Sequence, residues 1–271
     1  MTDATDFGPF NSVPTTEVHL RAAPLVRVLS QVRWDELTEF NDGFSEKAAR
    51  FARLLESEYP IAAQETEVRF DVTPNGVSQH AGATIHRFSS PDESWRVYFS
   101  PTYLTLETSA YRSRKDFLER LRAVLESLEL VAKIPRFIRL GFRYVNRVHD
   151  ADDYAMLPTL VKPQMLAGRD IPGLDEVQIA HTLSETLFIG KTHNLLAKWA
   201  ILPPNGSMDP TIEGVETESW VLDLDTYSES KEAFSAGSVV TKARELADGG
   251  HAFFRWAVTN EFIRQFGGEQ P

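Results

Sequence analysis

The chain of 271 residues is long enough to bury one large hydrophobic core or two smaller ones. It contains no cysteine, which excludes disulfides, thiolate zinc sites and cysteine nucleophiles, and its net charge of −11 disfavours broad binding to nucleic acid or to an anionic membrane. No apolar run reaches the roughly 18 residues of a membrane span, and the polar, acidic start lacks the pattern of a secretory signal. These features predict a cytoplasmic protein that does not enter a membrane.

The first part of the chain predicts an arm, a strand, a helix and two more strands. Residues 1–21 show no hydrophobic period and are expected to form a flexible or loosely docked arm. Residues 24–34 alternate between apolar and polar side chains, as a strand does. Residues 44–59 carry an apolar stripe at helical spacing. Short strands are expected near residues 68–72 and 83–88, with a Pro-Asn-Gly turn between them.

Residues 95–148 carry the clearest local pattern, which indicates strand, turn, strand, helix and strand. Alternation from Trp95 to Thr108, broken by a turn, predicts a β-hairpin. Ser113 precedes Asp116 by three residues, as at the start of a capped helix. Alternation then returns and continues to Val148. Because short turns join neighbouring strands, an antiparallel sheet is favoured, with helices packed on it.

The last part of the chain predicts three strands, a long loop and a helical end. The expected strands are residues 177–188, 195–202 and 220–224. A loop of roughly 16 residues begins at Pro203, long enough to bind a ligand. The helix that starts near Ser235 is expected to be interrupted by the pair Gly249 and Gly250 and then to resume; Thr259 is expected to cap a final helix.

We therefore predict an α+β protein with two associated subdomains, each a mainly antiparallel sheet packed with helices. The boundary falls where the pattern weakens after residue 148, so that the flexible arm covers residues 1–21, the first subdomain 22–150 and the second 151–271. The core is expected to contain Val28, Val32, Phe51, Leu55, Val97, Phe99, Leu106, Leu121, Leu125, Leu140, Phe142, Leu222 and Leu224.

A row of arginines is the strongest chemical candidate. In the strand RLGFRYVNR, Arg139, Arg143 and Arg147 point to one face, because residues two apart in a strand share a face. Arg27 and Arg33 occupy corresponding positions on the first strand. A sheet face that carries several guanidinium groups can bind phosphate or carboxylate through paired hydrogen bonds. These five arginines are therefore the predicted ligand-binding residues.

The alternative is that the arginine row is structural. The acids Glu67, Asp71 and Glu107 lie on strands from which they could form cross-strand ion pairs with the row, or with Arg96 of the hairpin. Exposed ion pairs contribute little to stability, so such pairs would indicate neither a site nor a strong structural requirement. The sequence leaves both interpretations open.

Asp223 and Asp225 are a weaker candidate, for a divalent cation. Their spacing puts both carboxylates on one face of a strand. Two carboxylates are too few for a ligand set, Lys198 could neutralise one of them, and no metal site is predicted. The residues that could complete a set are Asp175, His181, Glu185 and His193. Signatures of hydrolases, P-loops and dinucleotide-binding folds are absent from the sequence, so no catalytic residue or cofactor is predicted.

Three segments, PLVRVLSQVRW, WRVYFSPTYLTLETSAYRSRKDFLERL and RLGFRYVNRV, resemble a sporadically distributed bacterial protein family of uncharacterised function. The likeness covers nearly the whole chain, including the LDLD strand at residues 222–225. The resemblance implies a bacterial cytoplasmic protein and is compatible with an accessory role such as phage defence. It brings no activity and no catalytic residue.

Two functional hypotheses follow. The first is a non-catalytic binding or adaptor protein of an accessory bacterial system, whose partner is another protein and which also binds a small anionic ligand. The second is an enzyme acting on a phosphate-bearing substrate such as a nucleotide. In that case the arginines would stabilise charge, and Asp223 with Asp225 would bind a metal ion.

Overall fold

The fold is that of a computed structural model, which describes Phe10 and residues 18–41, 43–73, 76–166, 168, 177 and 179–268, without the side chains of residues 67–81. The chain forms two compact units, each assembled from separate stretches. Unit 1 consists of Met1–Val28, Phe142–Tyr227 and Glu245–Pro271, and unit 2 of Leu29–Gly141 and Ser228–Arg244. The division at residue 150 expected from the sequence stays a prediction, and most of the arm at residues 1–21 lies outside the described residues.

The described strands form a large antiparallel sheet that is packed with helices, which confirms the predicted α+β class. The strands are β1 (Leu25–Arg33), β2 (Ile61–Thr73), β3 (Gly76–Ser89), β4 (Trp95–Ser100), β5 (Tyr103–Thr108), β7 (Arg139–Val148), β8 (Thr182–Ile189), β9 (Asn194–Leu202) and β10 (Ser219–Ser228), with a small separate ladder of β6 (Arg136–Phe137) and β11 (Glu232–Ala233). The helices are α1 (Thr38–Asn41), α2 (Phe44–Leu55), α3 (Arg114–Glu129), α4 (Ala151–Ala155), α5 (Leu157–Leu160), the 3-10 turn η1 (Pro163–Met165), α6 (Ala236–Ala257) and α7 (Asn260–Gln265).

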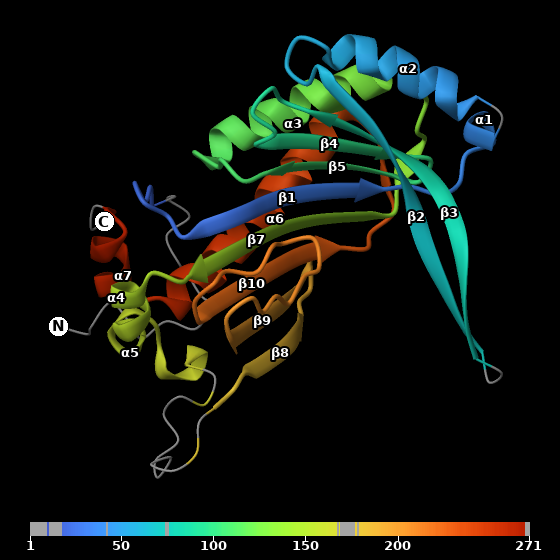
Figure 1. The fold of residues 1–271 in the computed structure, drawn as a ribbon. Coiled ribbons are helices and arrows are strands. Elements are labelled where there is room, and N and C mark those ends of the chain that lie inside the picture. Colours follow the sequence, from blue (N-terminus) through green and yellow to red (C-terminus); the bar gives the residue numbers. More distant parts are fainter. Residues whose placement is uncertain are drawn as a thin grey trace. The chain divides into compact units, whose positions relative to one another are not determined.

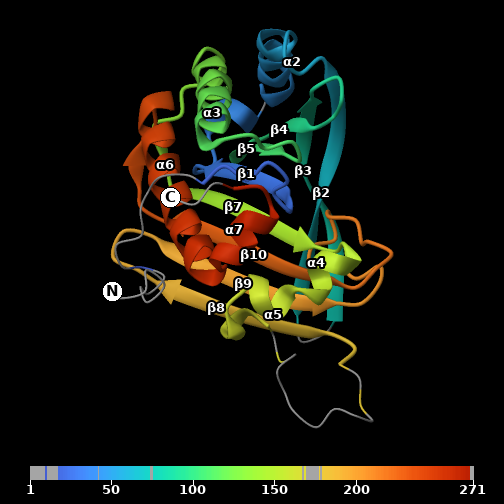
Figure 2. The ribbon, with the colours of Figure 1, turned by 90° about the vertical axis from the view of Figure 1, so that its left-hand side faces the viewer.

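Unit 2 contains the strand order β2, β3, β4, β5, β1, with α2 and α3 side by side on one face (Figures 1 and 2). Phe44 and Phe51 of α2 pack on Phe99 of β4, with ring centroids 4.9 and 5.1 Å apart. The predicted cap of α3 is confirmed, because the Ser113 side chain accepts a hydrogen bond from the Asp116 amide at 3.1 Å. The strands β2 and β3 are much longer than the two short strands predicted there, and the turn between them lies outside the described residues.

Unit 1 contains the strand order β7, β10, β9, β8. The helices α5, α6 and α7 pack on β9 and β10, because Trp220, Leu222 and Leu224 share one hydrophobic cluster with Phe253 and Phe262 (Figure 2). Every predicted core residue is buried, with at most 4% of its surface exposed. None of the described helices is both long and apolar enough to cross a membrane.

The predicted interruption at the glycine pair is wrong, since α6 continues through it without a break. A Cβ atom on Gly249 would lie 2.7 Å from Nε2 of His193, and one on Gly250 would lie 3.1 Å from Oγ1 of Thr226. The two glycines therefore let the helix approach the strands closely, and the surrounding packing outweighs the low helix propensity of glycine. The cap predicted for the last helix is confirmed, because Thr259 accepts a hydrogen bond from the Phe262 amide.

Candidate functional site

In unit 1, three of the five predicted arginines contact one loop. This β9–β10 loop, residues 203–218, connects β9 to β10. Arg27 projects from β1, and Arg143 and Arg147 project from β7 on one face of that strand. The contacts that each arginine makes with the loop differ in kind, and this difference decides which of them could bind a ligand.

Arg143 is neutralised by two carboxylates. Its Nε and Nη2 atoms donate to the two oxygens of Asp223 on β10 at 2.7 Å each, and its Nη1 atom donates to Asp209 of the loop at 2.9 Å. Burial alone would lower the pKa of Arg143, but the hydrogen bonds and charges of Asp223 and Asp209 raise it above its ordinary value. Arg143 therefore stays protonated and joins the loop to β10.

Asp209 is held from both sides. Besides its contact with Arg143, it accepts hydrogen bonds from the amide and the hydroxyl of Thr211 at 2.9 and 2.6 Å. Burial by itself would raise the pKa of Asp209, but the hydrogen bonds from Thr211 and the charge of Arg143 leave that pKa lowered. The carboxylate is therefore ionised at neutral pH and fastens the loop to the sheet.

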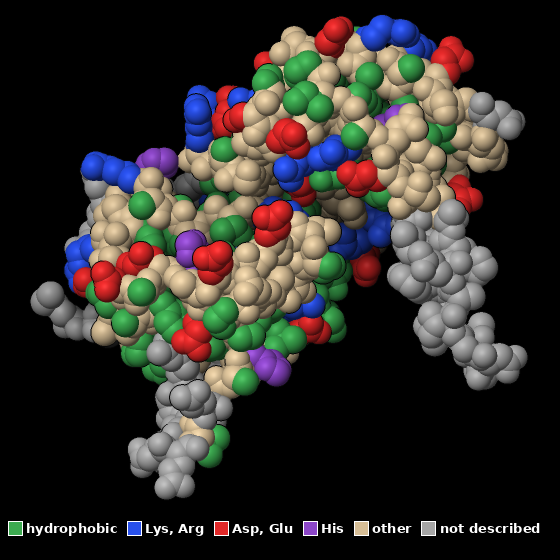
Figure 3. All heavy atoms as spheres, in the orientation of Figure 1, with side chains coloured by type: hydrophobic (Ala, Val, Ile, Leu, Met, Phe, Trp, Pro, Cys, Tyr) green, Lys and Arg blue, Asp and Glu red, His purple; other side chains and the backbone are tan. Residues whose placement is uncertain are grey.

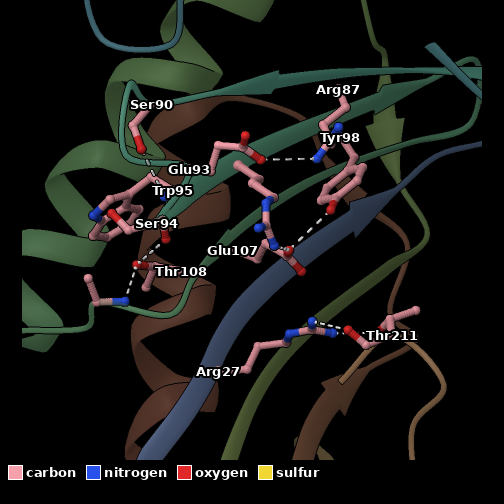
Figure 4. Close-up of polar contacts among 12 residues, drawn as sticks. Arg27, Arg87, Ser90, Glu93, Ser94, Trp95, Tyr98, Glu107, Thr108 and Thr211 are labelled. Carbon is pink, nitrogen blue, oxygen red and sulfur yellow. Dashed lines mark hydrogen bonds and ion pairs between the residues drawn. The ribbon is translucent and has the colours of Figure 1, made fainter. Parts of the chain in front are cut away.

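Arg27 holds the same part of the loop through neutral acceptors. Its guanidinium group donates to the backbone carbonyl of Thr211 at 2.6 Å and to the hydroxyl of Thr211 (Figure 4). The loop also packs through Met208 and Ile212 against a small hydrophobic cluster that includes Val145 and Val221. The loop thus covers the arginine face with apolar as well as polar contacts.

Arg147 is buried without a counter-charge. Only 5% of its surface is exposed, and its Nη1 atom donates to the backbone carbonyl of Glu213 in the loop at 2.6 Å. Its Nε atom has no hydrogen-bond partner, and none of the carboxylates in the described part of the chain forms an ion pair with it. Burial lowers the pKa of Arg147. A guanidinium group in this setting lacks the charged acceptor that it binds best.

Strand geometry puts Ser219 on the same face as Arg147, where the loop ends and β10 begins. Arg143 and Asp223 bond to each other across β7 and β10, which are neighbouring strands that run in opposite directions (Figure 1). Arg147 follows Arg143 by four residues and Ser219 precedes Asp223 by four, so antiparallel pairing brings these two to the same position on the same face. Ser219 is fully buried and its Oγ atom has no hydrogen-bond partner. Each of the two residues thus has a polar atom without a hydrogen-bond partner, on the strand face that the loop covers.

The neck of the loop is fixed by its backbone. The amide of Asn205 donates to the carbonyl of Val215 at 2.6 Å, and Asn205 has a φ of 63°, a conformation that asparagine tolerates better than most residues. A Cβ atom on Gly214 would lie only 2.4 Å from the backbone oxygen of Asn205. Glycine is required at position 214 because the two sides of the neck approach so closely.

The other two predicted arginines belong to unit 2. The guanidinium carbon of Arg33 lies 5.8 Å from the centre of the Tyr103 ring, and the side chain of Arg139 is half-buried. The five predicted arginines are thus divided between two units.

Unit 2 contains one of the ion pairs that the structural alternative expected. Glu107, with 7% of its surface exposed, lies 3.3 Å from Arg96 and accepts a hydrogen bond from the Tyr98 hydroxyl at 3.1 Å (Figure 4). Burial, followed by the charge of Glu107, raises the pKa of Tyr98 to about 12. The side chains of Glu67 and Asp71 lie outside the described residues.

The aspartate pair on β10 does not have two carboxylates available. Asp223 is engaged by Arg143. Lys198, which lies opposite Asp223 in the strand register, pairs with Glu185 at 2.6 Å instead. Within the described ranges no group of three histidine, aspartate or glutamate side chains could hold a metal ion, and Asp175 lies outside those ranges.

The residues of the loop were missed by the sequence interpretation. Asp209, Thr211 and Glu213 supply the loop's contacts with the arginines. One signal was present: the loop carries four acidic residues and neither lysine nor arginine. An acidic loop in a chain with a cationic strand face indicates that the two meet.

No family model matches the chain, and no curated protein matches it, so the function must be argued from this site.

Proposed function

We propose that this chain is a non-catalytic binding or adaptor protein that recognises an anionic group, a carboxylate or a phosphate, at Arg147. The observation that carries the proposal is the burial of Arg147 without a counter-charge, on the same strand face as the unsatisfied hydroxyl of Ser219. An unpaired buried charge is costly, and an oxyanion would supply both the charge and the missing acceptor.

The loop contacts suggest how such a group would be admitted. The backbone carbonyl of Glu213 is a neutral acceptor, so an anion would compete well for Nη1 of Arg147. Arg143 differs, because its Nε, Nη1 and Nη2 atoms already donate to Asp223 and Asp209. We therefore assign ligand binding to Arg147, with Ser219 as its neighbour, and loop positioning to Arg143 and Arg27.

The wider role rests on the family resemblance of the sequence. A cytoplasmic adaptor in an accessory bacterial system, such as phage defence, would bind its anion and a protein partner together. Affinity purification of the tagged chain from its native host, with and without added phosphate, tests for that partner. Recovery of no specific protein under either condition would contradict the adaptor role.

The binding test uses isothermal titration with inorganic phosphate and with acetate at low and high salt. We expect wild-type binding to weaken as salt rises, because part of the attraction is screened. Arg147→Met should reduce affinity by about tenfold or more, in line with the worth of a charge-assisted hydrogen bond. Arg136→Met is the matched control, since Arg136 is half-exposed and pairs with Asp35 in unit 2.

Two results would contradict the proposal: neither anion binds, or Arg147→Met binds as well as wild type. Thermal unfolding of both variants controls for damage to the fold. Arg147→Met removes a buried charge that has no counter-charge and loses one hydrogen bond to a carbonyl, so stability should stay unchanged or rise.

The alternative is an enzyme acting on a phosphate-bearing substrate. Its proposed metal role for Asp223 would require the bidentate pair with Arg143 to open. Incubation with nucleoside triphosphates and Mg²⁺ separates the two proposals. Turnover that is lost in Asp223→Asn but not in Arg136→Met would favour the enzyme, whereas binding without turnover supports the binding protein.

A further inference from the structure

The strand β8 lies at the end of the strand row of unit 1 (Figure 1). It pairs along its full length with β9, from Thr182 opposite Ile201 to Ile189 opposite Asn194. None of the described strands pairs with its other side. The outer backbone groups of such a strand form a template on which another strand can pair.

One face of β8 carries an exposed apolar row. Exposure alternates along the strand, and Leu183, Leu187 and Ile189 are 60, 49 and 81% exposed. In Figure 3, hydrophobic side chains gather along the lower margin of this unit, where β8 lies in Figure 1. Large aliphatic side chains repeated on one face of an edge strand are uncommon in a chain that stays monomeric.

The protections that edge strands usually carry are missing from β8. Its sequence, TLSETLFI, contains no proline, lysine or glycine. Its single charge, Glu185, is paired with Lys198 of β9 at 2.6 Å, so it would oppose an incoming strand mainly where a like charge lies directly opposite it. The strand is therefore suited to pairing in sequence as well as in position.

We propose that β8 pairs antiparallel with β8 of a second copy of this chain, around a two-fold axis at Thr186. In this register Leu183 of each copy meets Ile189 of the other, and Glu185 meets Leu187. The two aliphatic rows then meet on one face, and the two copies contribute the same surface, as a two-fold interface requires.

The charge pattern selects this register over its neighbour. A two-fold axis at Glu185 would place the two Glu185 side chains opposite each other, and like charges directly opposite are destabilising. It would also pair Leu183 with Leu187 and so place Ile189, the most exposed of the three aliphatic residues, against His181. The axis at Thr186 separates the two Glu185 side chains and pairs Ile189 with an aliphatic side chain, so both features favour this register.

The inference does not depend on the proposed anion site, and salt distinguishes the two. Each copy carries a net charge of −11, so the copies repel each other at low salt. Dimerisation should strengthen as salt screens that repulsion, whereas anion binding should weaken. Because one strand pair is smaller than the roughly 1,200 Å² of a standard interface, we expect a dimer that dissociates on dilution.

Sedimentation equilibrium over a hundredfold range of protein concentration is the first test. We expect the mean mass to rise from that of a monomer toward that of a dimer, and Leu183→Lys with Ile189→Lys to hold it at the monomer. Leu130→Lys is the matched control, since Leu130 is 67% exposed but lies in unit 2. A wild-type monomer at every concentration and salt overturns the proposal, as does a dimer that the β8 variant leaves intact.

Cysteine cross-linking is the second test, and it determines which residues of the two β8 strands lie opposite each other. The chain has no cysteine, so an introduced one is unique. Directly opposed residues have Cα atoms about 5 Å apart, within disulfide range, whereas diagonal ones lie about 7–8 Å apart. With oxidised glutathione, Thr186→Cys should form a covalent dimer and Glu185→Cys should not. Cross-linking of neither variant, or of Glu185→Cys alone, overturns the register and the proposal.

Discussion

At the scale of single residues, Arg143 and Arg147 lie on the same face of one strand and have opposite roles. Arg143 is matched by two carboxylates, and Arg147 by a carbonyl alone. Strand periodicity is enough to place both on one face. It cannot show which one is neutralised, because Asp209 and Asp223 come from a loop and a strand more than 60 residues further along the chain.

This difference predicts that replacing arginine with methionine lowers the stability of the fold at position 143 but not at position 147. Arg143→Met would leave Asp223, of which 7% of the side chain is exposed, without its partner, so we expect a loss of about 3–5 kcal/mol in the free energy of unfolding. Chemical denaturation measures it. Arg122→Met is the control, because Arg122 is half-exposed and lies 3.9 Å from Glu126, and it should change stability by less than about 0.5 kcal/mol. Equal losses of stability in Arg143→Met and Arg122→Met would contradict the structural role of Arg143.

At the scale of elements, the β9–β10 loop is ordered by its neck as well as by the arginines. The sequence indicated its length and its starting Pro-Pro-Asn-Gly turn. It could not indicate that Asn205 and Gly214 would meet, because contacts across a loop depend on how its ends are held.

The glycine pair of α6 was misinterpreted for a related reason: local propensity favoured a break, while close contact with Thr226 and His193 favoured glycine inside a continuous helix.

The neck offers a test that leaves every arginine unchanged. Gly214→Ala would put a Cβ atom 2.4 Å from the backbone oxygen of Asn205, so the backbone must move and the loop should loosen. We expect faster amide hydrogen exchange in residues 203–218 and a stability loss of about 1–3 kcal/mol. Gly237→Ala in α6 is the control, since its nearest neighbouring atom would be 3.9 Å away and alanine favours helices by about 1 kcal/mol. Unchanged exchange in Gly214→Ala would show that the neck does not hold the loop.

At the scale of the whole molecule, the sequence predicted the class and the core, because alternation in strands and stripes in helices mark the buried faces directly.

The pH dependence of stability follows from groups that only the fold brings together. The folded-state pKa of Tyr98 is raised to about 12 by burial and by Glu107, from an ordinary 10.0. As the pH rises, the Tyr98 hydroxyl therefore loses its proton in the unfolded chain before it does so in the folded one.

The stability that arises from the raised pKa of Tyr98 is fully present below about pH 10 and is lost as the pH rises toward 12. Denaturant unfolding at a series of pH values between 8 and 12 should show wild-type stability falling over that window. Tyr98→Phe should show a shallower fall, whatever its stability at pH 8. Parallel curves for the two proteins would argue that Tyr98 titrates normally in the fold.

The chain passes between its two units at residues 28/29, 141/142, 227/228 and 244/245, and these positions lie within β1, β7, β10 and α6. A gene fragment that encodes one unit alone would therefore end in the middle of a strand or helix and leave its backbone groups unpaired. Neither unit can be inherited, exchanged or expressed as a separate module by a single cut in the coding sequence. Truncated versions should be recovered as insoluble protein.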